Sequence, residues 1–133
     1  GIQWDETLKW LIDTGEKTYA EICVNSTSWG NYFNNNFTYY TNTSKSTATK
    51  PLYNGTIIPS GAYEGANANN VYDLAGNVND WTLESNGSDT GNCRCNRGGG
   101  YDNDGNHSPA SRSNDYPSDS GNKIGLRCSL FIK

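Results

Sequence analysis

The feature that most constrains this chain is a long polar stretch enclosed by two apolar segments. Residues 85–122 have almost no aliphatic side chains and are rich in Gly, Asn, Ser and Asp. Such a stretch is normally a solvated loop or a disordered segment, and loops on a rigid scaffold are where binding surfaces usually lie. The segment that follows, residues 124–132, predicts a half-buried strand because its apolar residues alternate strictly. They are Ile124, Leu126, Cys128, Leu130 and Ile132.

The composition favours a loop-rich fold with a few aromatic anchors. Only 33% of the residues are hydrophobic, whereas 12% are aromatic. Small polar residues favour turns, and the aromatic content argues against simple disorder. At 133 residues, we expect a single domain spanning residues 1–133.

Helices are expected at the N-terminus and short strands after them. Trp4, Leu8 and Leu11 recur at helical spacing and predict a helix over residues 5–14, with Asp5 as its N-cap. Gly15 is placed to end that helix in the left-handed conformation. Further expected elements are a short helix at residues 17–24, strands at 37–40, 56–59, 70–74 and 78–83, and a turn at 75–77. In the strand at 78–83, Val78 and Trp81 are the expected buried anchors.

Charge and cysteine usage exclude several kinds of partner. The net charge is −4 and no basic run occurs, so we expect no nucleic-acid binding. No apolar stretch approaches the roughly 20 residues of a membrane span. The cysteines lack zinc-site spacing, and incidental thiols are favoured over one structural disulfide. They are Cys23, Cys93, Cys95 and Cys128.

Three sequence blocks resemble a known family. Residues 70–82 read NVYDLAGNVNDWT and resemble the signature N-x-Y-D-[LM]-A-G-N-V-W-E-W-T of the formylglycine-generating-enzyme (sulfatase-modifying-factor) family. Residues 97–101 are similar to its R-G-G-S-[WY], and residues 125–127 to its closing G-F-R. The resemblance implies an α+β, C-type-lectin-like fold of the formylglycine-generating-enzyme type. In that fold, one or two helices pack on short, twisted antiparallel strands with long loops.

Departures from the family pattern argue against catalysis. The resemblance implies two redox-active cysteines after the second block, in a chemistry that uses thiols and copper. The matching positions hold Asn103 and Ser108, and neither side chain supplies a thiolate. Asn79 replaces the first tryptophan of W-E-W. We therefore expect no catalytic residues, no cofactor and no enzyme activity.

The C-terminal segment further resembles the variable proteins of diversity-generating retroelements. In those proteins adenine-specific mutagenesis rewrites Asn codons, and it cannot produce Lys, Glu, Gln, Trp or Met from them. Residues 85–122 contain none of these five residue types. The resemblance implies a variable ligand-binding segment at about residues 79–123.

Side chains of this segment have the chemistry of antibody paratopes, where Tyr supplies contact area and Ser, Gly and Asn supply adaptable hydrogen bonds. The predicted ligand-binding residues are Asn79, Asn96, Tyr101, Asp102, Asn103, Asp104, Asn106, His107, Ser113, Asn114, Asp115, Tyr116, Asp119, Ser120 and Asn122. Residues 102–106 resemble the start of a calcium loop, but Ser113 holds the position of its final acidic ligand, so no metal site is expected. Trp81, Arg97, Gly98, Gly99, Gly100 and Arg127 are expected to be scaffold, with the arginines bonding backbone carbonyls.

The leading hypothesis is a receptor-recognition protein with a diversified surface, on a phage tail or a bacterial cell surface. Its partner would be a protein or cell-surface receptor whose identity the sequence leaves open, as it does the oligomeric state. One alternative is a structural virion or surface domain of the same fold with fixed loops. A second alternative is a formylglycine-generating-type oxidoreductase.

Overall fold

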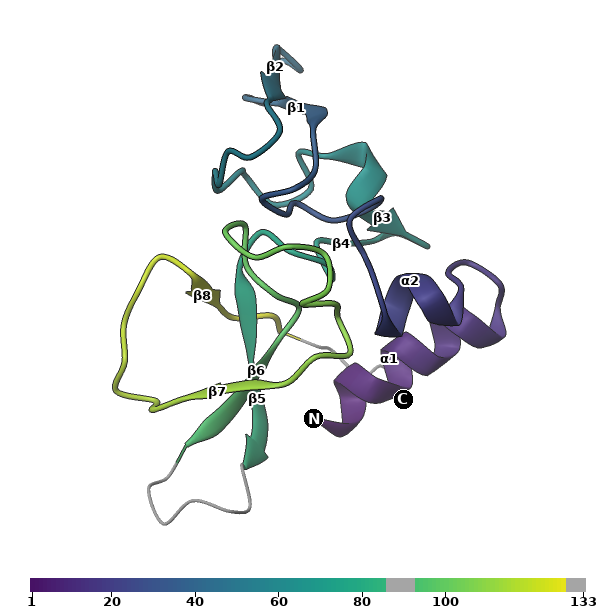
Figure 1. Cartoon of the computed structure of the whole chain (residues 1–133), viewed down its shortest axis with the longest axis vertical. Helices are drawn as coiled ribbons and strands as arrows, with labels where there is room; N and C mark the ends of the chain where they lie inside the picture. Colours follow the sequence, from purple (N-terminus) through teal and green to yellow (C-terminus); the bar gives the residue numbers. More distant parts are fainter. Residues whose placement is uncertain (86–92, 129–133) are drawn as a thin grey trace.

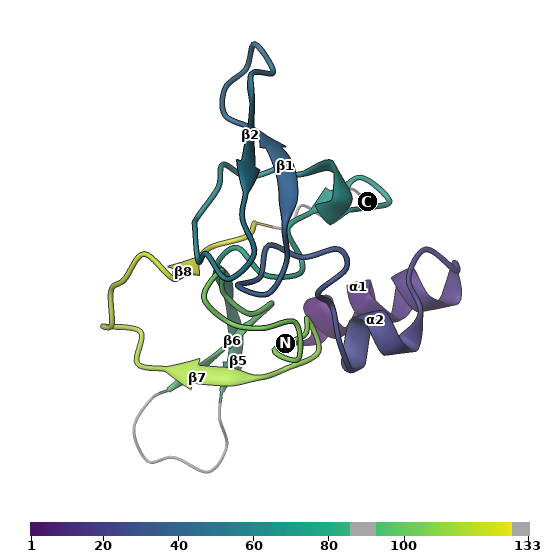
Figure 2. The same cartoon turned by 45° about the horizontal axis from the view of Figure 1, so that its top comes forward.

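The computed structural model describes residues 1–85 and 93–128 (Figure 1). Two helices, α1 (Ile2–Asp13) and α2 (Tyr19–Cys23), pack side by side next to the largest sheet. A hairpin of strands β1 (Phe37–Tyr40) and β2 (Thr47–Lys50) lies at one end of the molecule, as Figure 2 also shows. The fold is α+β, with curled sheets and long loops.

Local sequence signals account for both helices. Gly15 has a φ of 73° and ends α1 as expected. A capping box begins α2, in which the Thr18 hydroxyl accepts from the Glu21 N–H and the Glu21 carboxylate accepts from the Thr18 N–H. The expected N-cap was wrong, because α1 begins at Ile2 and Asp5 lies within its first turn.

The main sheet has the strand order β7-β6-β5-β8. Its strands are β5 (Asn79–Ser85), β6 (Arg94–Arg97), β7 (Ser113–Asp115) and β8 (Ile124–Gly125). Neighbours pair antiparallel except β5 and β8, which are parallel, so the sheet is mixed rather than antiparallel throughout. A small antiparallel pair, β3 (Asn67–Ala68) and β4 (Val71–Tyr72), lies beside the 3-10 helix η1 (Glu64–Ala66).

The core is built from α1, α2, the segment that follows α2, β3 and the turn after β4. Its buried members come from both halves of the chain: Trp4, Leu8, Leu11, Ile22, Trp29, Tyr32, Ala68, Leu74 and Ala75. A smaller cluster of Phe37, Ile58 and Ala62 lies under the β1–β2 hairpin. There the rings of Phe37 and Tyr63 stack with centroids 3.9 Å apart.

Several strand predictions need correction. Residues 56–59 form no strand; Ile58 is buried, but a hydrogen-bonding asparagine rather than a partner strand satisfies its backbone. Val78 and Trp81 are only half-buried, while Asp80 between them is 5% exposed.

The half-buried strand predicted at residues 124–132 is also much shorter in the structure. β8 ends at Gly125, and Leu126 is 77% exposed because the chain leaves the sheet there. Leu130 and Ile132 lie outside the described residues.

Candidate ligand-binding surface

Buried groups of the N-terminal half hold residues 98–110, the middle part of the polar stretch. The Trp4 indole N–H donates to the carbonyl of Pro109 at 2.8 Å. The Tyr32 hydroxyl lies 3.0 Å from the carbonyls of both Gly98 and His107. Burial strongly raises the pKa of Tyr32, so this hydroxyl remains a hydrogen-bond donor at any ordinary pH. The loop is therefore an ordered part of the structure.

Asn77 is a second anchor beneath this loop. Its amide bonds both the N–H and the carbonyl of Ile58, each at 3.1 Å, and accepts from the Asn31 amide at 3.0 Å. The Asn77 carbonyl accepts from the N–H of Tyr101 at 2.8 Å. One buried asparagine thus joins the turn after β4, the segment before η1 and the start of the candidate surface.

The glycines after β6 are required by close backbone approach. Gly98 and Gly99 have φ values of 98° and 74°, a region that favours glycine. A Cβ at Gly99 would lie 2.3 Å from the carbonyl oxygen of His107, so no side chain fits there.

Both motif arginines are scaffold, but they bond differently. Arg127 donates to the carbonyl of Asp73 at 3.1 Å, as predicted, and to the carboxylate of Asp80 at 3.2 Å. Burial raises the pKa of Asp80, and the Arg127 charge opposes that shift. Arg97 was expected to bond carbonyls; its fully buried side chain instead pairs with the carboxylate of Asp5, which links β6 to α1.

One group of predicted residues gathers around Gly100. A Cβ placed on Gly100 would lie 3.0 Å from a carboxylate oxygen of Asp102 and 3.3 Å from the amide nitrogen of Asn79, so both side chains lie against this glycine. Lys123 connects this group to the end of the polar stretch, because its ammonium pairs with Asp102 at 2.5 Å and its carbonyl accepts from the Asn79 N–H. The hydrogen bond with Asp102 raises the pKa of Lys123. Asn103 is half-buried, and its side chain accepts from the Gly100 N–H.

A second group surrounds Asp104. The Asp104 carboxylate accepts from the N–H of Asn106 at 3.0 Å and lies 3.3 Å from the His107 ring nitrogen. The hydrogen bond with His107 lowers the pKa of Asp104. The neighbouring Gly105 N–H donates to the side chain of Asn34, so this group adjoins residues of the N-terminal half.

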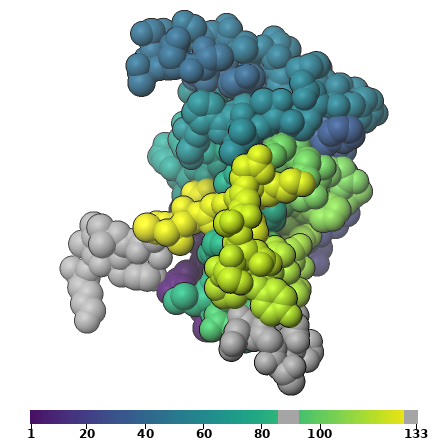
Figure 3. Space-filling view, turned by 90° about the vertical axis from the view of Figure 1, so that its left-hand side faces the viewer, coloured from purple at the N-terminus to yellow at the C-terminus, as the bar shows by residue number. Residues whose placement is uncertain are grey.

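The third group lies on β7 and on residues 116–123, the arch between β7 and β8, which crosses the centre of the face seen in Figure 3. Its exposed residues are Ser113, Asn114, Tyr116, Asp119, Ser120 and Asn122.

The prediction that Asn96 contacts the ligand is wrong, because its side chain is buried. It is 2% exposed in the central strand β6, where its amide donates to the Asp115 carboxylate at 2.8 Å.

The remaining predicted residues are exposed or half-buried. Asp102, Asn106 and His107 are exposed; Asn79, Tyr101, Asn103, Asp104 and Asp115 are half-buried. Sequence reasoning missed the neighbours that the N-terminal half supplies. The Phe33 N–H donates to the Asn103 carbonyl at 2.8 Å, and Phe33 pairs with the exposed ring of Tyr53. No local pattern marks contacts between residues so far apart in the chain.

The positions of the family's redox cysteines do not fit a thiolate-bound copper ion. Asn103 uses its side-chain oxygen to accept a backbone hydrogen bond, and Ser108 is 1% exposed. Cys95 lies buried within β6 and Cys128 is exposed; both are free thiols.

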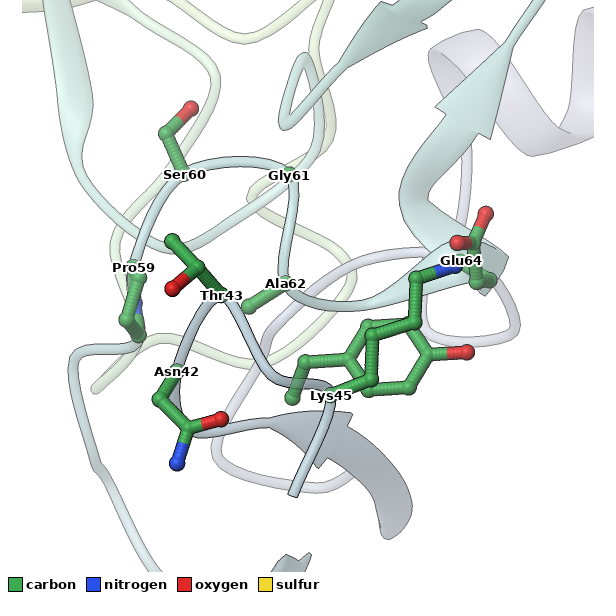
Figure 4. A pocket seen from close by; sticks show the side chains of 9 residues that line it. Asn42, Thr43, Lys45, Pro59, Ser60, Gly61, Ala62 and Glu64 are labelled. Carbon is green, nitrogen blue, oxygen red and sulfur yellow. The ribbon is translucent and has the colours of Figure 1, made fainter. Parts of the chain in front are cut away.

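A hollow of about 360 Å³ lies apart from the predicted residues, between the β1–β2 turn and the loop before η1 (Figure 4). The turn that carries Asn42 and Thr43 faces Pro59 and Ala62 there. The Lys45 ammonium lies 5.3 Å from the centre of the Tyr40 ring, so the aromatic face is already covered.

Comparison with known proteins gives one match. The family model described as the sulfatase-modifying factor enzyme 1-like domain matches residues 12–130. No curated protein and no solved structure matches the chain. Within the described residues, no helix is long and apolar enough to cross a membrane. The match spans most of the chain, which therefore belongs to the family of sulfatase-modifying factor enzyme 1-like domains.

Proposed function

We propose that this protein is a non-catalytic, ligand-binding member of its family, with a C-type-lectin-like fold that displays a diversified surface. The ligand is a protein or cell-surface receptor, bound by the loop and arch of about residues 79–123. The protein would act on a phage tail or a bacterial cell surface.

The observation that carries the proposal is the separation of framework and display within one segment. Arg97, Gly98 and Gly99 are buried, with Arg97 paired to Asp5 of α1 and Gly98 bonded by Tyr32, whereas Asp102, Asn106 and most residues of β7 and the arch are exposed. Buried framework residues and exposed residues thus lie within the same segment of the chain. A binding surface that changes without unfolding needs this arrangement.

The coding locus tests the proposal. We expect a near-identical repeat of the segment beside a reverse-transcriptase gene, with differences confined to adenines of the repeat. Sister isolates should then differ at the exposed positions and agree at Arg97, Gly98 and Gly99. Changes scattered over the whole chain, with neither repeat nor reverse transcriptase, would contradict diversification and favour a structural domain with fixed loops.

A further inference from the structure

Apolar side chains of the N-terminal half lie exposed beside the candidate surface. Tyr53 is 67% exposed and Phe33 is 38% exposed, and their rings pair with centroids 5.6 Å apart. Leu52, the neighbour of Tyr53 in the sequence, is also exposed. Together Phe33, Leu52 and Tyr53 make an exposed aromatic patch.

Two backbone hydrogen bonds join the aromatic patch to the predicted ligand-binding residues. The Tyr53 N–H donates to the Phe33 carbonyl at 2.9 Å, and the Phe33 N–H donates to the Asn103 carbonyl at 2.8 Å. Asn103 stands between Asp102 and Asp104, which belong to the first and second groups of predicted residues. The patch therefore adjoins the loop at the point where these two groups meet.

The segment that carries Tyr53 also contacts the start of this loop. A Cβ placed on Gly55 would lie 3.4 Å from the ring of Tyr101 and 3.5 Å from the Cα atom of Asp102. A ligand that covers the first two groups therefore lies next to the aromatic patch.

The backbone of Tyr53 indicates that its side chain serves more than the fold. Its φ is 59°, in the left-handed region, where a bulky side chain is uncommon and glycine fits with less strain. The exposed side chain offsets little of this strain by burial. Backbone strain of this kind concentrates at functional sites. Fold stability therefore does not explain a tyrosine here, whereas a ligand that buries the ring does.

The aromatic patch supplies what the neighbouring polar residues lack. Protein interfaces combine an apolar centre with a polar rim, and a few aromatic residues provide most of the binding energy. Around Gly100 and Asp104 the predicted side chains are mostly those of Asn, Asp and His. Residues 33, 52 and 53 lie outside the segment that is proposed to vary. The patch can therefore stay constant while its polar surroundings change.

We propose that Phe33 and Tyr53 are a fixed anchor of the ligand-binding surface, on which an apolar side chain of the protein ligand packs. This inference rests on the proposed function and deepens it. Burial of the two rings gives affinity that different ligands share, and the variable polar residues around them select among those ligands.

Selection of new binders tests the anchor, with lysozyme and serum albumin as the probes. The full chain would be displayed with the exposed residues Asp102, Asn106, His107 and those of the arch randomised. In the recovered binders, Tyr53→Ala should weaken binding about tenfold. Tyr19→Ala is the matched control, because Tyr19 is also 67% exposed but lies on α2, and it should leave binding unchanged.

Tyr53→Gly separates binding from folding. Glycine suits the left-handed backbone at this position, so the free energy of unfolding in urea should change little. Binding should still fall about tenfold, because the ring is lost.

Three results would overturn the anchor. Binders that are insensitive to both substitutions of Tyr53 would exclude it and leave the proposed function standing. Equal losses from Tyr53→Ala and Tyr19→Ala would mean that the position of the ring does not matter. A library that yields no binder to either probe, whichever residue stands at position 53, would remove the proposed function and the anchor together.

Discussion

Asn77 combines a left-handed backbone with a side chain whose hydrogen bonds are made inside the protein. Its φ is 66°, and its amide bonds two backbone groups of Ile58 and the amide of Asn31. Asparagine tolerates this conformation better than most residues, and buried polar groups are costly when unpaired. Backbone conformation and buried bonding thus both favour asparagine at this position.

Asn77→Ala should therefore destabilise the fold by about 4 kcal/mol, from the lost hydrogen bonds at about 1 kcal/mol each and about 1 kcal/mol of backbone strain. Denaturation in urea measures the change. Asn70→Ala is the matched control, because Asn70 has a φ of 64° but an exposed side chain. The control should lose only about 1 kcal/mol; equal losses in the two variants would show that the Asn77 side-chain bonds contribute nothing.

Lys50 is a second buried polar residue that supports the middle of the chain. It is 1% exposed, and its ammonium donates to the carbonyls of Tyr32 and Asn35, each at 2.7 Å. Burial lowers the pKa of Lys50 below its usual 10.5. Between the folded-state pKa and 10.5 the unfolded chain binds more protons, so this group makes stability rise with pH in that window.

Lys50→Met removes this titration and isolates its effect. The free energy of unfolding of the natural chain relative to the variant should increase from neutral pH towards 10.5 and level off above it. Urea titrations of both proteins across this range give the difference, in which the other titrating groups cancel. A difference that stays constant or falls as the pH rises would contradict a buried, charged Lys50.

At the scale of elements, local sequence patterns predicted the helices and strands that short-range interactions determine. The apolar spacing around Leu8 and the glycine at position 15 gave α1, and β-branched and aromatic residues gave β1. Strand β6 was missed because its residues, Arg94 to Arg97, show no apolar alternation. Asn96 and Arg97 are nevertheless buried, with carboxylate partners on other elements. The apolar alternation after Ile124 overstated β8, because alternation does not show whether a partner strand continues.

The capping box stabilises the start of helix α2, and this helix contacts the segment that carries the candidate surface. The carbonyl of Ile22 accepts from the N–H of Ala110 at 3.3 Å. Thr18→Ala removes the side chain that accepts from Glu21, and we expect a loss of about 1 kcal/mol in the free energy of unfolding.

Thr7→Ala is the matched control for Thr18→Ala. Its hydroxyl bonds the Gln3 carbonyl within α1, and alanine is the better helix former, so the free energy of unfolding should change little or rise. Thermal or urea unfolding of both variants measures this. Equal effects of the two substitutions would mean that the cap does not stabilise α2.

Across the whole molecule, the N-terminal half supplies the framework on which the C-terminal half is displayed. The sequence motifs located the candidate surface, and of its predicted residues only Asn96 is buried. The supporting bonds of Trp4 to Pro109, Tyr32 to Gly98 and Asn31 to Asn77 join residues distant in sequence, so no local pattern could reveal them. The proposed binding surface requires that its outward side chains do not hold the fold.

Resistance to protease of two displayed variant libraries tests that claim most directly. One library randomises the exposed residues Asp102, Asn106, His107, Ser113, Asn114, Tyr116, Asp119, Ser120 and Asn122. The other randomises the framework residues Asn31, Tyr32, Asn77, Arg97, Gly98 and Gly99. We predict that most members of the first library stay folded, since exposed substitutions change stability by about 0.5 kcal/mol or less each, and that few members of the second do. Equal loss of protease resistance in the two libraries would contradict the account.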